Sequence, residues 1–555
     1  MREQAGDHPG SGRDPRRPLT AWVRGGQWAV ALTLTALVVA AHVACFLHAG
    51  ALWRDEINSV NVAGMPSFSQ FSYYTRWDSF PIGWPLVLRA YLATGLGGTD
   101  TGLRALGLGM GLAALAALWW TARSFTRDVP LVSLALAAAA PAVIRYGDAV
   151  RAYGLGILLS LLAMGLLWRA VQRPDWRRLA AAAAAAVLSV NVIYHNAILL
   201  LALGVGGTAV GLLHRDWKRV AGVLGIGLVS AAALLAINWR HLTSAGEWNT
   251  MVKTTVSLEW LFTHKVMTTL NASGEFMTWL WLVMLAVALG ACVYRLVRPA
   301  GPEGAQRDLP LFILTAMPVA VVGYFWFLRA VSYVTEPWYY VALMVFLAVL
   351  IEAAVHTVVQ ANTVGRIVRL ALVVVVAALI APNVWREVHT RMTNLDLVAA
   401  KLEALASQDD FVIVTTYHPG ITFNRYYRGP TPWATLPDIR DHRVHRMDEI
   451  KEKMAEREPL RPVLQKMAQT LASGHRVWVV GKLWLMRPGE RPGYLPPAPQ
   501  GPTGWYEQPY VDLWLGQAGY FIQCHANRLS RVPVPVDDPV SQYEEEMLLV
   551  IEGWR

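Results

Sequence analysis

Residues 28–48 read WAVALTLTALVVAAHVACFLH and decide the class of fold. The run contains no Lys, Arg, Asp or Glu. It reaches the length of roughly 20 mostly apolar residues that a helix needs to cross a bilayer. The apolar core of a cleaved signal peptide spans only about 7–15 residues. We therefore predict that 28–48 is a retained membrane-spanning helix rather than a signal peptide.

Runs of the same kind recur through most of the chain. Hydrophobic residues make up 54% of the sequence, charged residues 16%, and the mean hydropathy is +0.34. A typical soluble domain has about 25% charged residues. The sequence thus predicts a mostly α, polytopic membrane helix bundle of about eleven transmembrane helices. Besides 28–48, the predicted spans lie near 103–122, 129–145, 154–170, 178–192, 196–213, 219–237, 277–296, 309–328, 338–357 and 367–384.

The net charge of +10 follows the predicted loops. Arg is concentrated in the polar N-terminal segment and in every second short loop, and membrane proteins keep such loops on the cytoplasmic side. The N-terminus is therefore predicted to be cytoplasmic, and an odd number of spans places the C-terminus outside the cytoplasm. The polar part holds no dense tract of Lys and Arg with interleaved aromatic residues, which argues against a nucleic-acid partner. The basic segments contain Arg2, Arg13, Arg16, Arg17 and Arg24; Arg123 and Arg127; Arg169, Arg173, Arg177 and Arg178; Arg215, Lys218 and Arg219; Arg295, Arg298 and Arg307; Arg366 and Arg369.

This pattern divides the chain into three parts. Residues 1–27 are polar and rich in Gly, Pro and Arg, and they are predicted to be a disordered cytoplasmic tail. Residues 28–384 form the membrane domain, and residues 385–555 are predicted to form an α/β domain outside the cytoplasm. In this last part we predict buried strands at 411–414, 476–480 and 546–551, polar helices at 395–407 and 446–472, and a Pro-rich loop at 487–503.

Two adjacent acids, Asp55 and Glu56, follow the first predicted span directly. One explanation is a helix cap, because acids favour the first turn of a helix. The other is a general base at the membrane surface, where a lipid-borne and a water-borne substrate can meet. Neighbouring helical residues point about 100° apart, so one acid would face a reacting atom while the other binds a cation or holds nearby donors. Arg54, which precedes the pair, is predicted to support it.

The stretch 66–89 that follows this pair is rich in aromatic residues. We predict amphipathic helices that lie on the bilayer surface. The aromatic side chains either anchor these helices at the membrane interface or stack against a ligand, and the first role is the commoner one. They are Phe68, Phe71, Tyr73, Tyr74, Trp77, Phe80 and Trp84.

A second external turn, at 145–154, places five polar side chains between two apolar runs: Arg145, Tyr146, Asp148, Arg151 and Tyr153. Ionisable residues between membrane helices are costly, and they indicate a functional site by default. The plain alternative is that Asp148 pairs with Arg145 or Arg151 and only closes the turn. The functional alternative is that Arg151 binds a phosphate, whose oxygens suit a planar guanidinium, with Asp148 and Tyr153 as supporting residues.

Two further external turns carry polar residues. In Tyr194-His195-Asn196, the imidazole is either an ordinary interfacial side chain or a ligand to the same phosphate. In the other turn, Arg329 precedes the sequence Glu336-Pro337-Trp338-Tyr339-Tyr340. Arg329 either neutralises a phosphate or extends its charge to the membrane interface, and Tyr339 is predicted to support the site.

Together, the segments around Asp55, Arg151, His195 and Tyr339 resemble the GT-C superfamily of membrane glycosyltransferases. The resemblance is to the bacterial branch near the protein O-mannosyltransferases and the lipid A aminoarabinose transferase. That family has an Asp-Glu pair just after its first membrane helix, which Asp55 and Glu56 match in type and position. Its acidic-Arg-Tyr turn is similar to Asp148, Arg151 and Tyr153, although two residues rather than one separate the acid from the Arg.

The other two motifs match the family less closely. Tyr194-His195-Asn196 is similar to a His-aromatic pair before the sixth helix of the family. Glu336 to Tyr340 is similar to a late aromatic turn, where Arg-Tyr is more usual than Trp338-Tyr339. The resemblance covers residues 28–384, and the C-terminal part is similar in kind to the soluble appendage of some members.

The resemblance implies a sugar donor carried on a polyprenyl phosphate, used outside the cytoplasm at the inner (plasma) membrane of a bacterium. It implies inverting transfer to a lipid, glycan or protein acceptor, with Asp55 as the base that deprotonates the acceptor. Glu56 would assist or, in members that use one, hold a divalent cation. Arg151, Arg329 and His195 would bind the leaving phosphate, whose developing charge needs stabilisation. Membrane lipids would surround the helices.

The main alternative is a lipid or glycolipid transporter or flippase, which would use the same charges as a pathway. Transporters often contain inverted repeats, and none is apparent in this sequence. Their charges also tend to lie at mid-span, whereas these cluster at external helix ends. A third alternative is a non-catalytic assembly protein whose C-terminal part binds a partner. The sequence shows no Gly-rich phosphate loop and no metal-ligand cluster, so the divalent cation is the one cofactor that the resemblance leaves open.

Overall fold

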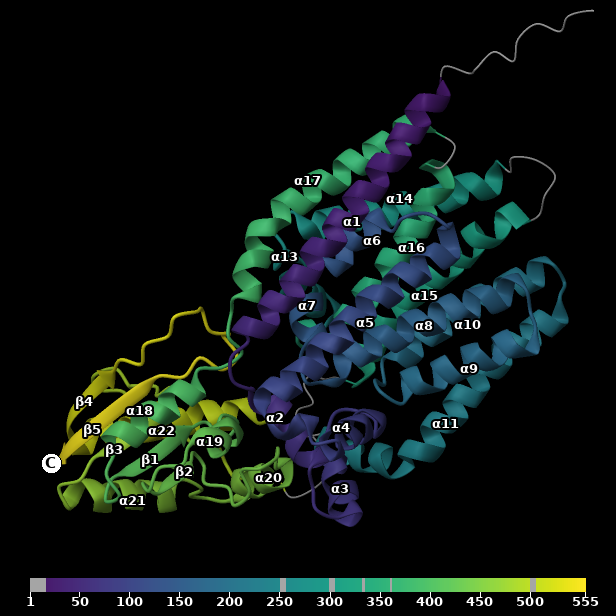
Figure 1. Ribbon diagram of the computed structural model, residues 1–555. Helices are drawn as coiled ribbons and strands as arrows, with labels where there is room; N and C mark the ends of the chain where they lie inside the picture. The colour runs from purple at the N-terminus through teal and green to yellow at the C-terminus, as the bar shows by residue number, and fades with distance from the viewer. Residues whose placement is uncertain (1–15, 250–255, 299–304, 332–334, 360–361, 500–505) are drawn as a thin grey trace, which may run out of the picture.

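The computed structural model describes residues 16–249, 256–298, 305–331, 335–359, 362–499 and 506–555. Within this part of the chain, nine helices are long and apolar enough to cross a membrane. They form a bundle, and the C-terminal domain packs at one end of it (Figure 1). The nine are α1 (Arg16–His48), α5 (Asp100–Thr126), α8 (Ala152–Gln172), α10 (Asn196–Leu213), α11 (Trp217–Asn249), α14 (Met277–Val297), α15 (Ala305–Val331), α16 (Val341–Val359) and α17 (Thr363–Val388).

These helices confirm the prediction of a mostly α membrane bundle, but two of the predicted spans are shorter than expected. The run at 129–145 is interrupted before Pro141, which begins a new helix because it lacks an N–H group. The segments there are α6 (Leu131–Ser133), the π-helical turn η3 (Leu134–Ala138) and α7 (Pro141–Gly147). The run at 178–192 forms α9 (Trp176–Val190), whose 15 residues fall short of a full span. The predicted number of eleven is therefore not reproduced by helices of full spanning length in the described residues.

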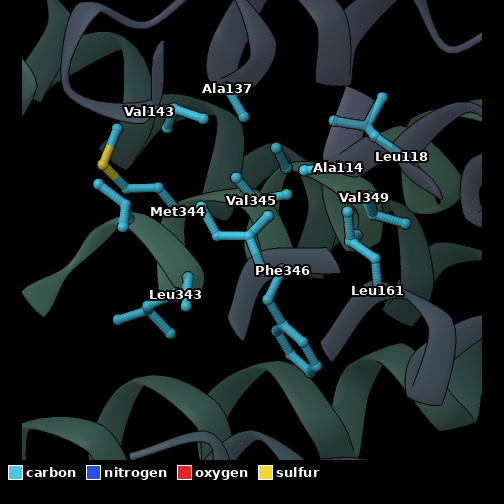
Figure 2. Close-up of a cluster of buried hydrophobic side chains, with 14 of the residues drawn as sticks. Ala114, Leu118, Ala137, Val143, Leu161, Leu343, Met344, Val345, Phe346 and Val349 are labelled. Atoms are coloured by element: carbon cyan, nitrogen blue, oxygen red, sulfur yellow. The ribbon is translucent and has the colours of Figure 1, made fainter. Parts of the chain in front are cut away.

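Helix α16 lies at the centre of the bundle. Its residues are apolar on every side and nearly all are buried, as expected for a helix surrounded by other helices. At the periphery, α1 and α17 lie side by side (Figure 1) and expose apolar side chains such as Leu37 and Val368. Figure 2 shows the packing around α16, with Leu343, Met344, Val345, Phe346 and Val349 beside Ala114 and Leu118 of α5, Ala137 of η3, Val143 of α7 and Leu161 of α8.

Short helices cover the end of the bundle that carries the C-terminal domain. Helix α1 begins at Arg16. The prediction of a disordered tail over 1–27 is therefore wrong for residues 16–27, which are helical, and residues 1–15 lie outside the described residues. The predicted surface helices in 66–89 are present. The elements at this end are α2 (Arg54–Ala63), α3 (Phe68–Tyr74), η1 (Thr75–Trp77), α4 (Gly83–Ala93), η2 (Leu96–Gly98), α12 (Leu258–Trp260), η4 (Leu261–Val266), α13 (Met267–Asn271) and η5 (Pro337–Tyr339).

The C-terminal domain is built on a five-stranded sheet in the order β2-β1-β3-β5-β4. Strands β1, β2 and β3 are parallel, whereas β5 runs antiparallel to both of its neighbours. The three strands predicted from the sequence are present as β1, β3 and β5, and the described part of the Pro-rich loop, 487–499, contains no helix or strand. The elements are α18 (Leu395–Leu405), β1 (Phe411–Thr415), α19 (Gly420–Tyr426), β2 (Trp433–Thr435), α20 (Met447–Ala455), α21 (Arg461–Ala472), β3 (Val477–Gly481), α22 (Gln508–His525), β4 (Ala526–Val532) and β5 (Leu548–Trp554).

A helical layer covers each face of this sheet. On β1, Phe411 and Ile413 face the core formed with α20, α21 and α22, whereas Val412 and Val414 face α18 and α19. Strand β3 follows the same alternation. Because successive residues of a strand point to opposite faces, two apolar faces require two covering layers. The outcome is the α/β domain that the sequence predicted.

The C-terminal domain docks on the chain just after α1 through polar contacts to the backbone. The Tyr426 hydroxyl accepts a hydrogen bond from the N–H of Leu52 at 2.7 Å. The carboxylate of Glu544 accepts a hydrogen bond from the N–H of Arg54 at 3.3 Å. The first of these N–H groups lies two residues before α2 and the second belongs to the first residue of α2, so a domain far along the chain helps to fix the position of Asp55.

Candidate functional site

A cavity of about 270 Å³ lies where the C-terminal domain meets the membrane domain. One wall comes from the start of α2, the turn after η1, the start of α8 and η5, and the other wall comes from loops of the C-terminal domain. Of the four turns singled out in the sequence, three meet here. The cavity is lined by Arg54, Asp55, Asn58, Trp77, Asp78, Ser79, Arg151, Tyr153, Glu336, Trp338, Tyr339, His418, His445, Met447, Tyr506, Glu507, Gln508 and Tyr543.

Asp55 faces this cavity among three nitrogen groups. Nη2 of Arg151 lies 3.9 Å from its Oδ2, while Nε of Arg54 and Nε2 of His445 lie 3.8 Å and 3.3 Å from its Oδ1. Burial by itself would raise the pKa of the Asp55 carboxyl, but Arg151, His445 and Arg54 outweigh it and hold the pKa well below its usual range. Asp55 is therefore an ionised carboxylate, with one-fifth of its side chain exposed.

Arg151 is a buried cation held in a fixed orientation. It is the N-cap residue of α8. Its Nη1 donates hydrogen bonds to the backbone oxygen of Asp55 at 2.9 Å and to Oγ of Ser59 at 2.8 Å. The guanidinium also lies over the ring of Phe80, 4.4 Å from the ring centre. Burial would lower the pKa of Arg151, but the carboxylates of Asp55 and Asp78 raise it above the usual value, so the charge is permanent.

Asp78 is a site residue that the sequence reasoning did not select. It follows η1, is only 2% exposed, and neither of its carboxylate oxygens makes a hydrogen bond of standard geometry within the described structure. Nη1 of Arg151 lies 3.9 Å from Oδ1. Burial raises the pKa of Asp78 and Arg151 offsets only part of that effect. Because a buried carboxylate without donors is costly, Asp78 marks a place where a ligand can donate hydrogen bonds; its signal in the sequence was an acid within the aromatic stretch 66–89.

Glu56 is turned away from the cavity and is fully buried. Its Oε1 accepts hydrogen bonds from Nη1 of Arg104 at 2.5 Å and from the N–H of Val150 at 2.8 Å, and its Oε2 accepts one from the N–H of Trp53 at 3.3 Å. The helical period thus separates the two acids as expected, and Glu56 is the one that holds nearby donors. Its position does not support a role in contacting substrate or a cation. Glu56 instead ties α2 to the turn that carries Arg151.

Asp148 is engaged elsewhere, which corrects the predicted pairing within its turn and the predicted supporting role of Asp148 itself. Nδ1 of His42 in α1 lies 2.8 Å from its Oδ1 and 2.9 Å from its Oδ2. Asp148 therefore pairs with neither Arg145 nor Arg151. Arg145 instead forms an ion pair with Glu387 at 3.3 Å.

The structure also places His195 and Arg329 outside the cavity lining. His195 is 5% exposed, and its ring packs 5.4 Å from that of Tyr324 and 6.2 Å from that of Tyr339. Burial lowers the pKa of His195 to about 3, so the imidazole is neutral and cannot act as a phosphate-binding cation. Arg329 is exposed near the end of α15. Their positions therefore do not support the prediction that both bind the phosphate, and His195 instead packs behind η5.

Three predicted supporting residues do line the cavity: Arg54, Tyr153 and Tyr339. Nη1 of Arg54 donates a hydrogen bond to the backbone oxygen of Tyr543 at 2.7 Å. The Tyr153 ring meets the edge of the Phe80 ring at a centre-to-centre distance of 5.3 Å. These contacts link the cavity wall on one side to the C-terminal domain and on the other to the segment after η1.

The opposite wall contains two imidazoles and a carboxylate from the C-terminal domain. Besides approaching Asp55, His445 donates its backbone N–H to the side-chain oxygen of Asn58 at 2.9 Å. His418 lies 3.7 Å from Glu507, whose other carboxylate oxygen accepts a 2.5 Å hydrogen bond from the Tyr417 hydroxyl. No sequence motif indicated these residues, because they lie in separate loops that only the packing of the two domains brings to α2.

The residues present do not fit the divalent cation that the resemblance left open. Arg151 lies 3.9 Å from both Asp55 and Asp78, and Glu56 is directed elsewhere. In the described part of the chain, no cluster of three or more His, Cys, Asp or Glu side chains is arranged to hold a metal ion. The guanidinium groups of Arg151 and Arg54 instead lie beside the cavity carboxylates.

Comparisons with known proteins give matches among solved structures alone. No protein-family model matches the chain, and no curated protein matches it. A crystal structure of ArnT from Cupriavidus metallidurans bound to undecaprenyl phosphate is similar with 13% identity, a TM-score of 0.49 and coverage of 96% of this chain and 98% of that chain. The same enzyme in the apo state is similar with 13% identity, a TM-score of 0.44 and coverage of 83% and 93%.

Proposed function

We propose that the protein transfers a sugar from a polyprenyl-phosphate-linked donor to a lipid, glycan or protein acceptor on the extracytoplasmic face of the bacterial plasma membrane. The observation that carries this proposal is the shared cavity of Asp55 and Arg151 at one end of the membrane bundle. A carboxylate that can take a proton and a fixed cation that can hold a phosphate are the two groups that such a transfer requires. The alternating Arg-rich loops support an orientation with this end of the bundle outside the cytoplasm.

Arg151 is assigned to the phosphate of the donor. Its guanidinium is already oriented by hydrogen bonds to Asp55 and Ser59, so little reorganisation is needed when charge develops on the leaving phosphate. Arg54 supplies a second cation in the same cavity. The polyprenyl tail of the donor would leave the cavity toward the membrane helices.

In the proposed step, the oxygen of an acceptor hydroxyl attacks the anomeric carbon of the sugar. Its proton passes to Asp55, the bond between the anomeric carbon and the phosphate oxygen breaks, and polyprenyl phosphate leaves. Attack from the side opposite to the leaving group inverts the anomeric configuration. Asp78, whose oxygens make no hydrogen bond of standard geometry within the described part of the chain, is assigned to accept hydrogen bonds from the sugar hydroxyls.

The low pKa of Asp55 makes it a weak base while the cavity holds no anion. Arg151 is the cation that lowers this pKa most. An entering phosphate would share the charge of Arg151 and would therefore raise the pKa of Asp55 toward that of an ordinary carboxyl. Donor binding thus strengthens the base before the acceptor loses its proton.

A lipid transporter or flippase is the alternative, and it would need ionisable groups along a path across the bundle. Asp55, Asp78 and Arg151 instead gather at one end, beneath the C-terminal domain. This arrangement favours a reaction site over a pathway.

The deciding experiment compares the wild type with Asp55→Asn, which keeps the size of the side chain. A radiolabelled polyprenyl-phosphate sugar is supplied, with membranes from cells that lack the gene as the source of acceptor. We expect D55N to lower transfer by about 10²–10⁴-fold, the usual contribution of a general base. Mass spectrometry of the labelled lipid and protein fractions would identify the acceptor.

The matched control is Asp175→Asn. Asp175 caps α9 through its side chain and is exposed, and Asn caps helices as well as Asp does. D175N should retain full transfer. Full activity of purified D55N would contradict the assignment of Asp55 as the base.

A further inference from the structure

A second hollow, of about 690 Å³, lies between α3, η1 and the end of α11. Helix α11 packs against η1 at this place, and Figure 1 shows α3, the helix just before η1, at the same end of the bundle as α11. The hollow is distinct from the cavity of Asp55. Thr75 and Arg76 of η1 line the hollow, whereas Trp77 and Asp78, the next two residues, line the cavity.

The charged side chains among the described residues that line this hollow are all basic. Arg76 and Arg240 line it together with His241, and none of the described residues that line it is Asp or Glu. Ser69 and Ser72 add hydroxyl groups. Guanidinium groups with nearby hydroxyls are suited to phosphate oxygens, so the hollow is complementary to a phosphate group.

Its apolar rim places the hollow at the membrane surface. Phe68 and Trp239 are each 63% exposed, and Ile237 is 54% exposed. Ile237 and Trp239 lie near the end of the apolar part of α11 that can cross the bilayer, Trp217–Thr243. Exposed aromatic residues at the end of a span lie at the level of the lipid headgroups. Arg76, stacked 4.2 Å from the centre of the Tyr73 ring, is therefore at the same depth as lipid phosphates.

We propose that this hollow binds the headgroup of an anionic phospholipid of the bilayer. The phosphate lies between Arg76 and Arg240, and the acyl chains run along Phe68, Ile237 and the outer face of α11. A ligand in the hollow contacts Thr75 and Arg76, whereas the next residues, Trp77 to Ser79, line the cavity together with Asp55. The ligand therefore contacts the segment before the cavity lining and not Asp55 itself.

A side-chain contact nevertheless joins the hollow to the cavity. Nε2 of His241 lies 2.8 Å from the backbone oxygen of Asp78. Lipid bound between Arg76 and Arg240 would hold η1 and α11 together and so fix the backbone that carries Asp78. This second step rests on the proposed function, whereas binding of the lipid does not.

The test uses the purified full-length chain in detergent and measures thermal stability and retained lipid by native mass spectrometry. Phosphatidylglycerol and phosphatidylcholine are added separately at matched concentrations. We expect phosphatidylglycerol to raise the melting temperature of the wild type and phosphatidylcholine to leave it unchanged. The double variant R76Q/R240Q should lose roughly 30-fold in affinity for phosphatidylglycerol, the effect of removing two charge contacts.

Arg177→Gln is the matched control, because Arg177 also lies over an aromatic ring, that of Trp176, 5.5 Å from its centre. R177Q should bind phosphatidylglycerol like the wild type, and the single variant R76Q provides the same measurement if the double variant does not fold. Equal binding of phosphatidylglycerol by the wild type and R76Q would overturn the proposal, and so would equal binding of the two lipids. Stabilisation by undecaprenyl phosphate at lower concentrations than phosphatidylglycerol would show that the occupant is the donor carrier instead. Since no sugar transfer is measured, a negative result here leaves the proposed function untouched, and loss of transfer in D55N leaves the lipid site untouched.

Discussion

Two clusters of buried charge lie toward opposite ends of the membrane bundle, and they differ in how completely their charges are matched. One cluster joins Glu352 of α16 to Arg369 of α17. The other joins Asp55, Asp78 and Arg151 at the cavity. Both are built from carboxylates and guanidinium groups among apolar helices, so the difference between them lies in their partners rather than in their chemistry.

In the first cluster, the carboxylate of Glu352 contacts both backbone N–H groups and the guanidinium of Arg369. Oε2 of Glu352 accepts hydrogen bonds from the N–H groups of Val132 at 2.6 Å and Ser133 at 3.1 Å. Nη2 of Arg369 lies 3.0 Å from Oε1 of Glu352 and donates a 2.6 Å hydrogen bond to the backbone oxygen of Val129. The pair therefore ties α16 and α17 to the interrupted segment that begins at α6, and it has a structural role.

In the second cluster, the carboxylates are not fully matched. Asp78 is as deeply buried as a core residue, but its oxygens make no hydrogen bond of standard geometry among the described residues, and Asp55 opens into a cavity. A protein tolerates such a cost where a ligand supplies the missing partners. Buried charges with full sets of partners thus stabilise the bundle, whereas buried charges without them indicate where a substrate binds.

The largest expected effect comes from breaking the matched cluster. Arg369→Ala leaves Glu352 buried without its counter-charge, which costs about 3–5 kcal/mol of unfolding free energy. We expect a clearly lower melting temperature and lower yield, with unchanged transfer per folded molecule. In E352Q/R369A, removal of the orphaned charge should restore part of the lost stability. An R369A protein as stable as the wild type would show that the pair is not structural.

Asp78→Asn should have the opposite effects, with stability kept or raised and transfer lowered. Burial raises the pKa of Asp78, so ionised Asp78 opposes folding increasingly as the pH rises above the usual carboxyl value of 3.8. We expect D78N to melt at the same or a higher temperature than the wild type at neutral pH. Transfer should fall roughly 10- to 100-fold, because a charged hydrogen-bond acceptor for the substrate is lost. A variant that is both less stable and fully active would contradict this assignment.

His445 tests how the C-terminal domain acts on Asp55. Its imidazole is one of the groups that lower the pKa of Asp55, so His445→Ala should raise that pKa. The acid side of the pH profile of kcat, which reports the substrate-bound enzyme, is expected to move upward by roughly 0.5–1 pH unit. His445→Gln, which keeps an N–H donor, should show a smaller shift. Identical profiles for H445A and the wild type would mean that His445 only packs against α2.

The smallest expected effect concerns the docking contact of Glu544. Burial raises the pKa of Glu544 to about 8, although Arg54 opposes the change. A carboxyl whose pKa is raised by folding takes up protons on folding, so its contribution to stability declines as the pH rises from about 4.5 to about 8. In Glu544→Gln the melting temperature should depend less on pH across this range. Equal slopes for the two proteins would show that Glu544 does not titrate there.

The sequence by itself determined the membrane bundle and three of the five strands of the C-terminal domain, β1, β3 and β5. Spans such as 28–48 and strands such as 411–414 form because contiguous apolar residues are buried. The length of an apolar run and the period of its apolar residues predict such burial from the local sequence. The sequence also selected Asp55 and Arg151, because charges at the ends of apolar helices are costly and need a reason. The interruption at Pro141 shows the limit of apolarity alone, since a missing N–H group changed the helix without changing its hydropathy.

Only the tertiary structure decided which of these charges act together. Glu56 and Asp148 are acids in the expected turns, but Arg104 and His42, from helices elsewhere in the bundle, occupy them. His445 reaches Asp55 because two domains pack face to face. The physical reason is the distance along the chain over which each property is determined. The burial of an apolar segment follows from residues that are neighbours in sequence, whereas the pairing of a charge depends on which atoms lie within a few ångströms of it in space.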